Sequence, residues 1–573
     1  MNKLITILLV CSILAGCKGG KSSKNEVIVH QLSDPDKLLP YSSTSADATS
    51  LERFLFQKLI DWDYEKNDFI GVLAVDRPKI SQHGDGLKLD FEIRPEAKWD
   101  NGTDITAYDV AFSYKAVLNP KTTCEQIRPY FDFLSDIVID STNPKKFSVY
   151  SNQKYILVEE YAGFWVLPEY IYDKDKIMRK FTIADFRNEK GKESLKSNKD
   201  ILRFADEFNS QKYSREKGFV VGSGPYEFSE WVTGSKIVFT KKKNWWGRHS
   251  SNEWLKNYGH VETIKFKIIN DWKTTTTAIK GNEIDAVKGI EYKIFTDLTK
   301  EPRFNESFQA FTPTSPQYLY IGINQTNAKF KDVRVRQALA HAVDKEQIIK
   351  TLLFGLGTSV ESMVGPEKKY YNKNLKKFDF NLETASKLLD EAGWKDSDGD
   401  GVRDMNVDGK KLKLQIEYKY NAGNDTRKNI GLIYKENLKK LGIELDIVAK
   451  EWTVFLDDLK KHDFEIYCGA WVGDPNVEDP KQIWHSESTN GGSNYVSYGD
   501  PVSDRLIDAI RMELDEKKRN ALYLQFQEKV HNDIPYIFLF APLERIAISK
   551  KFSNAKAYTV RPGYDLGLFK VGK

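Results

Sequence analysis

The chain has 573 residues, which is too long for one hydrophobic core, so we expect two or three domains. Hydrophobic residues make up 40% and charged residues 29%, a balance that fits a globular protein rather than a disordered one. The 86 basic and 82 acidic side chains leave a formal net charge of only +4, so the charge does not indicate a nucleic-acid partner.

The first residues, MNKLITILLVCSILAGC, have the pattern of an export signal. A basic start at Lys3 precedes an apolar stretch, Leu4–Ala15, that is too short to cross a bilayer as a permanent helix. Small residues directly before Cys17 resemble the bacterial lipoprotein box. We therefore expect a signal peptide over residues 1–16, lipidation of Cys17, and a flexible polar tether over residues 17–26. The alternative is an ordinary signal peptide followed by an incidental cysteine.

Cys124 and Cys468 are the two cysteines that lie beyond this export region. They are too few for a disulfide framework and too far apart in sequence to be assigned as a pair. No other apolar segment is long enough to span a membrane. We therefore expect a protein that is anchored to a membrane surface rather than embedded in the bilayer.

The first half of the mature chain alternates predicted strands and helices. A strand is expected at residues 27–31, and a helix at 51–60, where leucines recur with helical spacing. Another helix follows Thr106, with Asp109 three residues later as a variant of the capping box. Residues 173–217 are charged and poor in strand formers, which predicts an irregular, partly helical insertion.

The second half changes to strands and then to alternating helices and strands. Gly222 and Gly224 precede Pro225 in a predicted tight turn, and two strands flank Thr233-Gly234. Beyond about residue 312 the order of the elements predicts an α/β lobe. The expected elements are a helix at 333–354, a helix at 382–392, a strand at 412–420, a helix at 426–441, a strand at 443–448, a helix at 454–461 and a strand at 464–471.

One acidic segment, DSDGDGVRDMNVDG, has part of a calcium-loop pattern. Asp396, Asp398 and Asp400, followed by Gly401, match the first half of such a loop. The twelfth position, where a bidentate glutamate is expected, is Val407. The alternative is an acidic turn between a helix and the next strand, and any calcium bound here would be structural.

Motifs for catalysis are scarce. The eight histidines show no zinc-binding spacing, and the chain has no GxSxG nucleophile motif and no phosphate-binding or dinucleotide-binding loop. Paired carboxylates are too common in so acidic a chain to exclude a glycosidase by counting. Nothing in the residues indicates an enzyme or a cofactor.

Six segments carry a recognisable pattern when they are taken together. They are KWDNGTDITAYDVAFSYKAVL, GSGPYEFSEWVTGSKIVFTKKKNWWG, IKGNEIDA, YLYIGINQTNAKFKDVRVRQALAHAVDKEQI, ASKLLDEAGW and LYLQFQEKVHNDIPYIFLF. Each resembles a segment of the bacterial extracellular solute-binding proteins of the oligopeptide and dipeptide class (family 5), which serve as receptors for ABC importers. The resemblance follows the family's order and covers the chain from about residue 27 to residue 568.

The resemblance implies an α/β fold with two lobes that close on a ligand, a periplasmic-binding-protein clamshell of the class II-like type with an extra subdomain in its first lobe. The first lobe would comprise residues 27–311 plus 540–573, including an inserted subdomain at about 61–218, and the second lobe residues 312–539. The resemblance also implies binding without catalysis and without a cofactor. The protein would be a monomer in the cell envelope, periplasmic or extracytoplasmic, with its lipid anchor as the only contact with the membrane and ABC permease subunits as partners.

The resemblance also implies where a peptide ligand is held. In family members that bind peptides, an aspartate at a strand end, a few residues after a tryptophan, accepts the ligand's ammonium group. The matching run here is Ala470, Trp471, Val472, Gly473 and Asp474. Asp474 would accept the ammonium, and the residues before it would lend backbone groups and a wall. The other residues expected at the ligand are Trp452, Asn494, Tyr495 and Tyr41.

These assignments have simpler alternatives. Trp452 and Trp471 could be core residues, and the loop that contains Asn494 and Tyr495 could be an ordinary flexible surface loop. Asp479, which also precedes a proline, is expected to form a turn rather than to touch the ligand.

One departure from the family concerns the ligand's carboxylate. Some peptide binders have arginines near the positions of Leu459 and Cys468, and this chain has no cation at either position. Lys460 and Lys461 could substitute, or the ligand could be a peptide of another length or another compound.

The leading hypothesis is therefore a lipid-anchored receptor that delivers peptides to an ABC permease. Within the same class, a nickel complex, an opine or a sugar is the alternative ligand, because the fold does not dictate the solute. The rival class is a secreted hydrolase, which the absence of a nucleophile or metal motif disfavours.

Overall fold

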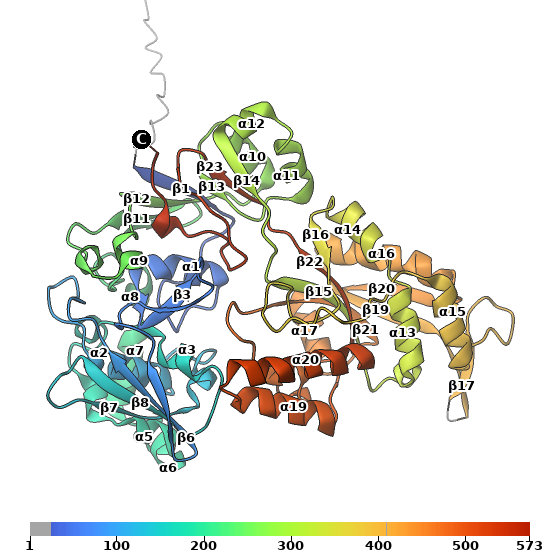
Figure 1. The fold of residues 1–573 in the computed structure, drawn as a ribbon, viewed down its shortest axis with the longest axis horizontal. Helices are drawn as coiled ribbons and strands as arrows, with labels where there is room; N and C mark the ends of the chain where they lie inside the picture. Colours follow the sequence, from blue (N-terminus) through green and yellow to red (C-terminus); the bar gives the residue numbers. More distant parts are fainter. Residues whose placement is uncertain (1–24, 408, 573) are drawn as a thin grey trace, which may run out of the picture.

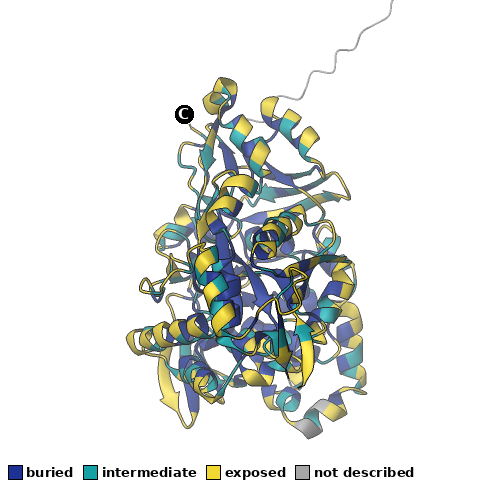
Figure 2. Ribbon diagram, turned by 90° about the vertical axis from the view of Figure 1, so that its right-hand side faces the viewer, coloured by how far each residue is buried: buried dark blue, intermediate teal, exposed yellow. Residues whose placement is uncertain are grey.

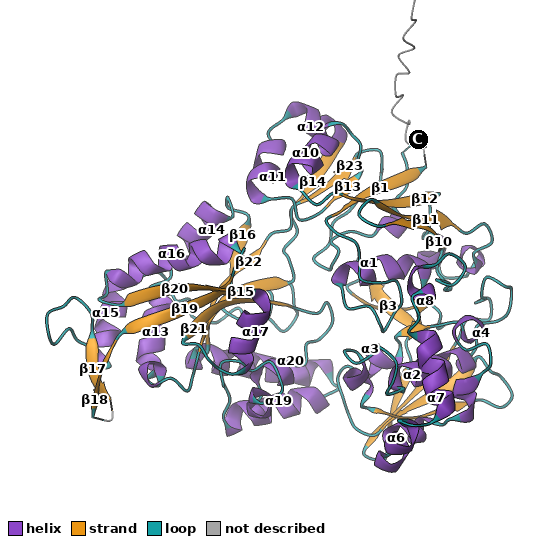
Figure 3. Ribbon diagram, turned by 180° about the vertical axis from the view of Figure 1, so that it is seen from behind, coloured by secondary structure: helices purple, strands orange, loops and turns teal. Residues whose placement is uncertain are grey.

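The computed structural model describes residues 25–407 and 409–572. The predicted signal peptide and Cys17 lie outside the described residues, as does most of the predicted tether. Within the described part of the chain, no helix is both long enough and apolar enough to cross a membrane. The described residues form two α/β lobes, which Figure 1 shows side by side and Figure 3 shows from behind.

Lobe I is the part of the molecule built on a seven-stranded mixed sheet. The first strand of the chain lies inside this sheet and pairs in parallel with neighbours on both sides. Valines at alternate positions of that strand, Val27 and Val29, are buried in the core, as the period of a strand requires. The strands are, in sheet order, β10 (Tyr226–Val232), β11 (Lys236–Lys241), β12 (Thr263–Ile268), β1 (Glu26–Gln31), β13 (Ala286–Val287), β23 (Ile546–Ser549) and β14 (Phe308–Phe311). Its helices are α1 (Ala46–Leu55), α9 (Glu253–Lys256), α10 (Trp272–Lys280), α11 (Tyr292–Leu298) and α12 (Pro302–Ser307).

A second group of elements extends lobe I below the seven-stranded sheet in Figure 1. It contains a four-stranded antiparallel sheet in the order β5-β6-β8-β7 and two short strand pairs, β2-β9 and β3-β4. The strands are β2 (Gln57–Lys58), β3 (Ile60–Asp63), β4 (Asp68–Gly71), β5 (Lys79–His83), β6 (Gly86–Glu92), β7 (Leu134–Ile139), β8 (Lys146–Ser151) and β9 (Trp165–Val166). The helices are α2 (Ala107–Leu118), α3 (Val158–Ala162), α4 (Glu169–Tyr172), α5 (Ile183–Arg187), α6 (Glu189–Leu195), α7 (Lys199–Phe208) and α8 (Lys212–Arg215).

Lobe II is built on a six-stranded sheet with helices packed around it. The strands are, in sheet order, β16 (Gly357–Ser359), β22 (Tyr536–Pro542), β15 (Gln317–Ile323), β21 (Ile466–Val472), β19 (Gln415–Asn421) and β20 (Glu444–Lys450). The helices are α13 (Val333–His341), α14 (Lys345–Leu352), α15 (Leu382–Glu391), α16 (Asp425–Lys439), α17 (Trp452–Lys460), α18 (Lys481–Trp484), α19 (Pro501–Met512) and α20 (Glu516–Asp533). A small hairpin, β17 (Asp404–Val407) and β18 (Lys410–Lys413), projects from the lobe. Figure 2 shows the strands in dark blue between helices with exposed outer faces.

Two chain segments connect the lobes and run side by side. The first follows β14, and the second joins β22 to β23. The Ser315 backbone N–H donates to the Pro542 carbonyl (2.9 Å), and the Glu544 N–H donates to the Pro313 carbonyl (2.8 Å). Because β22 belongs to the lobe II sheet as far as Pro542, that sheet extends past residue 540, where the sequence suggested a change of lobe. The exact residue boundaries of the lobes stay a prediction.

Local sequence signals account for most helix ends. The Asp109 carboxylate accepts hydrogen bonds from the Thr106 backbone N–H (2.9 Å) and hydroxyl (3.2 Å) at the start of α2, as predicted. Gly393 and Gly442 have positive φ angles of 90° and 69°, which glycine adopts without steric cost. The single helix expected at 333–354 is wrong, because the chain breaks between α13 and α14 where the Asp344 side chain caps the second helix by accepting from the Gln347 N–H (2.8 Å).

The two buried cysteines, Cys124 and Cys468, are free thiols. Burial raises the pKa of each thiol, to about 12 for Cys124, so both are protonated at neutral pH. Cys468 lies inside β21 and is fully buried in the lobe II core. The two cysteines are therefore small core residues rather than a disulfide.

Gly224 seats the turn before β10 directly on the end of α1, and this close approach predicts the effect of a substitution. Its N–H donates to the Leu55 carbonyl (2.8 Å), and a Cβ at this position would lie 2.4 Å from the Phe54 carbonyl oxygen. Gly224→Ala should therefore destabilise the fold by roughly 1–3 kcal/mol, because backbone atoms must move. Gly281→Ala is the matched control, since the nearest atom to its Cβ would be 3.4 Å away and its φ is −85°. Thermal unfolding should show a lower melting temperature only for Gly224→Ala, and equal melting temperatures for the two variants would contradict the packing.

Candidate functional site

Three neighbouring cavities lie between the lobes, and we call them together the interlobe cleft. Their volumes are about 310, 460 and 480 Å³. Pro475 of lobe II lines all three, Asp474 lines the first two, and each cavity has lining residues from lobe I as well. A further cavity of about 720 Å³ is lined only by residues between 172 and 213, so it lies within lobe I and away from the cleft. A ligand that contacts both lobes would occupy the interlobe cleft.

The backbone of β21 leads into the cleft and leaves one of its edges without a strand partner. β21 pairs with β15 along its whole length, from Ile466 to Val472. On its other side it pairs with β19 only through Ile466 and Tyr467. Residues 468–472 therefore have no strand on that side among the described residues. An extended chain can add to such an edge through backbone hydrogen bonds.

Asp474 follows this strand and is held by its own loop. The Gly473 N–H donates to the Pro316 carbonyl (2.7 Å), which fixes the point where the strand ends. The Asn476 backbone N–H donates to Asp474 Oδ1 (3.2 Å). Lys368 Nζ donates to the carbonyls of Asp474, Pro475 (2.8 Å) and Asn476 (2.7 Å). The lysine thus uses its donors on the loop backbone rather than on the Asp474 carboxylate.

A second carboxylate, Glu160, reaches the same cavity from lobe I. It lies on α3, and its Oε2 accepts a hydrogen bond from Asn476 Nδ2 across the cleft (2.9 Å). Burial, and then the charge of Asp474, raise the pKa of Glu160 to about 7. Burial likewise raises the pKa of Asp474. The two side chains line the 460 Å³ cavity together, so two carboxylates from opposite lobes share one poorly solvated space.

Glu478 adds a third acidic group behind Asp474. Burial raises its pKa to about 7, although the nearby Lys368 opposes the shift. The same burial lowers the pKa of Lys368. Glu478 and Asp474 are therefore two buried acidic groups of lobe II whose protonated forms are favoured by burial.

Two of the three cations of lobe I that line the 460 Å³ cavity have carboxylate partners, whereas the third, Arg561, donates to Gln317 Oε1 (3.5 Å). Lys58 Nζ lies 3.4 Å from Asp61 Oδ1 and over the rings of Phe164 (4.7 Å) and Trp165 (5.0 Å). Arg53 lies 3.8 Å from Asp61 and 3.6 Å from the buried carboxylate of Asp565. These groups weaken the negative charge of the cavity without contacting Asp474 or Glu160. Three basic and three acidic side chains line the cavity, and Asp474 and Glu160 are the carboxylates among them that form no ion pair with a described cation, so a cationic group of a ligand would pair with these two.

Two of the residues predicted from the sequence line the cleft, and the contacts of Trp471, Tyr495 and Ala470 with a ligand stay a prediction. Val472 and Asp474 both line the 460 Å³ cavity. The ring of Trp471 stacks on that of Tyr495, with centroids 6.2 Å apart, and Trp471 Nε1 donates to the Tyr536 hydroxyl (3.2 Å). Ala470 is partly buried against the lobe II core. These residues form the end of β21 and its immediate surroundings.

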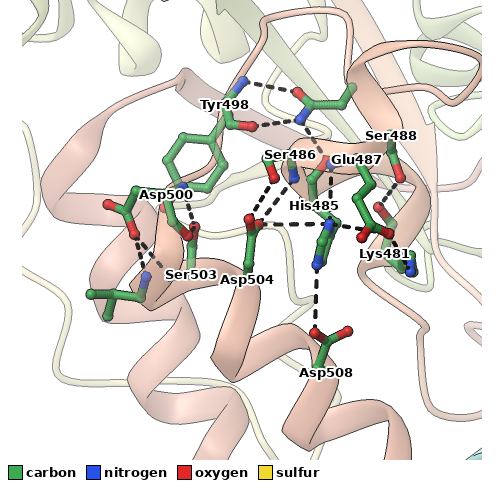
Figure 4. Close-up of polar contacts among 12 residues, drawn as sticks. Lys481, His485, Ser486, Glu487, Ser488, Tyr498, Asp500, Ser503, Asp504 and Asp508 are labelled. Atoms are coloured by element: carbon green, nitrogen blue, oxygen red, sulfur yellow. Dashed lines mark hydrogen bonds and ion pairs between the residues drawn. The ribbon is translucent and has the colours of Figure 1, made fainter.

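Two other predicted residues do not face a ligand. Asn494 is fully buried; its amide donates to the carbonyls of His485 (3.0 Å) and Tyr498 (2.6 Å) and accepts from the Tyr498 N–H (3.0 Å). Asn494 therefore holds His485 and Tyr498 together within lobe II. Figure 4 shows this region, in which His485 lies between Asp504 and Asp508. Tyr41 is buried in lobe I and donates its hydroxyl to the Trp165 carbonyl. We correct both assignments, because all the polar groups named are already used within the protein.

The remaining expectations have mixed outcomes. Trp452 is half exposed at the start of α17 and stacks on Phe455, and its role at the ligand stays a prediction. Asp479 is confirmed as a turn residue, since its Oδ1 accepts from the Lys481 N–H (2.9 Å) and its carboxylate pairs with Arg511 (2.9 Å).

The acidic loop lies outside the cleft. Asp396, Asp398 and Asp404 approach one another, with oxygen atoms within 4.8 Å, whereas Asp400 pairs with Lys413 instead. Asp396 accepts two backbone N–H groups of its own loop, and Asp398 pairs with Lys411 (2.8 Å). Lys413 also lies 3.6 Å from Asp398, so Asp398 and Asp400 share one lysine, and a calcium site at Asp396, Asp398 and Asp400 stays a prediction.

Glu160, Glu478 and Lys368 were not anticipated from the sequence. Glu160 lies 316 residues before its hydrogen-bond partner Asn476, so no local pattern could connect the two. Lys368 follows a glycine- and proline-containing loop that has no helical or strand period.

Comparison with known proteins gives concordant results. Residues 69–494 match the profile described as bacterial extracellular solute-binding proteins, family 5 Middle. The oligopeptide-binding protein AppA of Bacillus subtilis (strain 168) is 27% identical over 590 residues, which cover 100% of this chain and 98% of that protein. The structure of AppA from Bacillus subtilis in complex with a nonapeptide has a TM-score of 0.69 at 26% identity, over 96% of this chain and 99% of that chain. NikZ from Campylobacter jejuni in complex with Ni(L-His) has a TM-score of 0.69 at 21% identity, over 95% and 98% of the two chains, a likeness of fold alone.

The raised pKa of Glu160 predicts how stability changes with pH. Because the pKa rises from 4.5 to about 7 on folding, the protonated side chain is favoured in the folded state, and stability falls as the pH rises through that range. Glu160→Gln keeps an oxygen that can accept from Asn476 but removes the charge. The variant should gain about 3 kcal/mol over the wild type above about pH 7 and lose that advantage near pH 4, because the rise is about 2.5 pKa units and one unit corresponds to about 1.4 kcal/mol.

Melting temperature measured against pH checks this prediction. Glu159→Gln is the matched control, since the neighbouring Glu159 carboxylate pairs with Arg77 (2.5 Å) and its removal should not raise the melting temperature at any pH. A pH profile of Glu160→Gln parallel to that of the wild type would contradict the assignment.

Proposed function

The chain belongs to the bacterial extracellular solute-binding proteins, family 5, and we propose that it is an extracytoplasmic receptor that binds peptides between its lobes and passes them to an ABC permease. The fold class expected from the sequence, an α/β protein with two lobes of the periplasmic-binding-protein type, is confirmed by the structural similarities. Proteins of this family are binding proteins rather than enzymes. The similarity to an oligopeptide-binding protein over the whole chain supports peptides as the ligand class.

One observation carries the proposal: an interlobe cavity with two carboxylates that form no ion pair in the described residues lies at the end of a strand with an open edge. Residues 468–472 offer backbone groups on that edge, and Asp474 lies directly beyond them. A peptide placed along the edge would hydrogen-bond through its backbone without its side chains being read. Its terminal ammonium would meet the Asp474 carboxylate.

The charge of the ligand's ammonium explains why two carboxylates can share the cavity. When the lobes are apart, the Asp474 carboxylate on lobe II and the Glu160 carboxylate on lobe I are each partly solvated. When the lobes approach, burial raises the cost of both charges. A ligand ammonium between them would offset this cost, so the bound ligand favours the closed arrangement.

Contacts between the lobes outside the cavity support a closed arrangement. The Ile156 N–H of lobe I donates to the Arg511 carbonyl of lobe II (3.0 Å), and the Arg511 guanidinium lies over the Tyr155 ring (5.4 Å). In Figure 1 the two segments that join the lobes, near β14 and β22, lie above the level of α3, α19 and α20. A small rotation about those segments would open these contacts and expose the cavities to water.

The anchor and the partners complete the proposal. A lipid on Cys17, followed by the short tether, would keep the receptor close to the membrane and therefore to the permease subunits. We propose a monomer that touches the membrane only through this lipid. A nickel complex, an opine or a sugar stays the alternative ligand, since two carboxylates that would pair with a cation do not by themselves require a peptide.

Substitution of Asp474 tests the proposed ligand contact. A peptide recovered from a mixed library on the wild type should bind Asp474→Asn roughly thirty-fold or more weakly, because losing one partner of a buried charge pair costs about 2–5 kcal/mol. The N-acetylated form of the same peptide should bind the two proteins with similar, low affinity, since it has no ammonium. Isothermal titration calorimetry measures both affinities.

Asp297→Asn is the matched control, because Asp297 is an exposed carboxylate on α11 that pairs with Lys293 (2.8 Å) and lines none of the three cavities. It should leave peptide affinity unchanged. Equal losses for free and N-acetylated peptide in Asp474→Asn would refute the ammonium contact, and a wild type that binds no member of the library would refute the peptide receptor itself.

A further inference from the structure

The 480 Å³ cavity of the cleft differs in charge from the part around Asp474. It lies between the β3–β4 hairpin and α3 of lobe I on one side and the start of α20 with residues 475–477 of lobe II on the other. Four basic and three acidic side chains line it. It adjoins the 460 Å³ cavity, since Trp62 and Pro475 line both.

The three carboxylates of this cavity all pair with lysine or arginine, two of them with the same Arg77. Arg77 donates to both oxygens of Glu159 (2.5 and 2.7 Å) and to Asp68 (2.9 Å). Lys369 donates to Glu516 (3.1 Å). These pairs leave the cavity without a free acid among the described residues, so they cannot supply a counterion to any further cation.

Arg519 is such a cation. It lies in the first turns of α20, and its Nη1 donates to the carbonyls of Glu513 (3.0 Å) and Leu514 (3.2 Å). Its Nε is buried and has no hydrogen-bond partner in the described part of the chain. No carboxylate of the described residues forms an ion pair with its guanidinium. The Nη1 hydrogen bonds therefore hold the side chain in place, while the Nε–H group of the guanidinium has no acceptor among the described residues.

Trp62 presents a second unused donor from the other lobe. Its ring packs edge-on against Phe69 (5.1 Å between centroids) on the β3–β4 hairpin. Its Nε1 is also buried, and no described residue accepts its hydrogen bond. Trp62 and Arg519, from opposite lobes, thus line the same cavity, and each carries a buried N–H group that no described residue accepts.

Leaving such donors unpaired is costly. A buried donor without an acceptor costs about 1–3 kcal/mol, and more when it is charged. The planar guanidinium matches the two oxygens of a carboxylate better than it matches a neutral acceptor. An acceptor with a negative charge would satisfy Arg519 and could reach Trp62 as well.

We infer that the 480 Å³ cavity is a carboxylate subsite, in which Arg519 and Trp62 bind a carboxylate group of the ligand whose ammonium lies at Asp474. The inference rests on the proposed peptide-binding function and adds the second charged end that the ligand must have. Some peptide binders of the family have arginines near the positions of Leu459 and Cys468, where this chain has no cation. The inference supplies a cation for the ligand carboxylate at a different position, Arg519. The carboxylate comes either from the C-terminus of a short peptide or from an acidic side chain near the N-terminus.

The experiment compares peptides that differ only in their carboxylates, titrated calorimetrically into the full chain. The set comprises a short peptide without acidic side chains and with both termini free, its C-terminal amide, and amides that carry one glutamate at each position in turn. If the C-terminus is the source, amidation should weaken wild-type binding about tenfold or more. If a side chain is the source, amidation should change little and one glutamate position should strengthen binding by a similar factor.

In either case, Arg519→Gln should remove the difference between the peptides with and without the carboxylate. Trp62→Phe keeps the aromatic wall and should reduce that difference by a smaller factor. Lys369→Gln is the matched control, because this lysine lines the same cavity but is already paired with Glu516, and it should retain the full difference. If Arg519→Gln does not fold, as judged by its melting temperature, Trp62→Phe carries the test.

The outcomes separate this inference from the proposed function. The subsite alone would be overturned if peptides bind through Asp474 but their affinity for the wild type does not depend on any carboxylate. It would also be overturned if Arg519→Gln shows the same dependence on the carboxylate as the wild type. Absence of binding by the whole set and by a mixed library would overturn the peptide receptor and the subsite with it.

Discussion

Two carboxylates that face each other across the cleft set the main constraint on this molecule. Asp474 belongs to lobe II and Glu160 to lobe I, and the Asn476 side chain bridges toward Glu160. Each lobe can solvate its own carboxylate when it stands alone, but the lobes cannot approach without burying both. The free energy of closure therefore depends on what neutralises the pair, either a shared proton or a cation supplied from outside.

The fold fixes Asp474 firmly to lobe II, while the connection between the lobes allows Glu160 of lobe I to move relative to it. Lys368 and the Tyr523 hydroxyl bind carbonyls of the Asp474–Glu478 loop, and Arg511 holds Asp479, so the loop is fixed to lobe II. The two lobes are covalently joined only through the paired segments near Pro313 and Glu544. A rigid loop on one lobe and a narrow connection between the lobes allow closure to be governed by the cleft itself. The likeness of fold to a protein solved with a nickel complex indicates that the side chains of the cleft, rather than the scaffold, select the ligand.

Local patterns predicted the parts of the site that depend on one stretch of chain. The apolar run that ends at an Asp-Pro pair predicted β21 and the turn that follows it. The resemblance to the family then indicated Asp474 as the residue that contacts the ligand. Patterns failed where distant residues decide the outcome: Asn494 looked like a cleft residue, but backbone groups of His485 and Tyr498 bury it. Glu160, Arg519 and Trp62 could not be found from the sequence, because their significance comes from a cavity that two separate lobes form. The break between α13 and α14 was missed for a local reason, since Asp344 caps a new helix within an otherwise continuous helical pattern.

The central claim, that a ligand ammonium neutralises the buried carboxylate pair, is tested most directly by counting protons on binding. Calorimetric titration of a bound peptide at about pH 6, in buffers of different ionisation enthalpy, gives the number of protons exchanged, and at that pH nearly all α-amino groups are already charged. The pKa of Glu160 is about 7 in the closed arrangement without a ligand; relative to that state the ammonium should lower the pKa and release a substantial fraction of one proton, whereas the N-acetylated peptide should release none. Binding of the free peptide without proton release, or with proton uptake, would contradict the account.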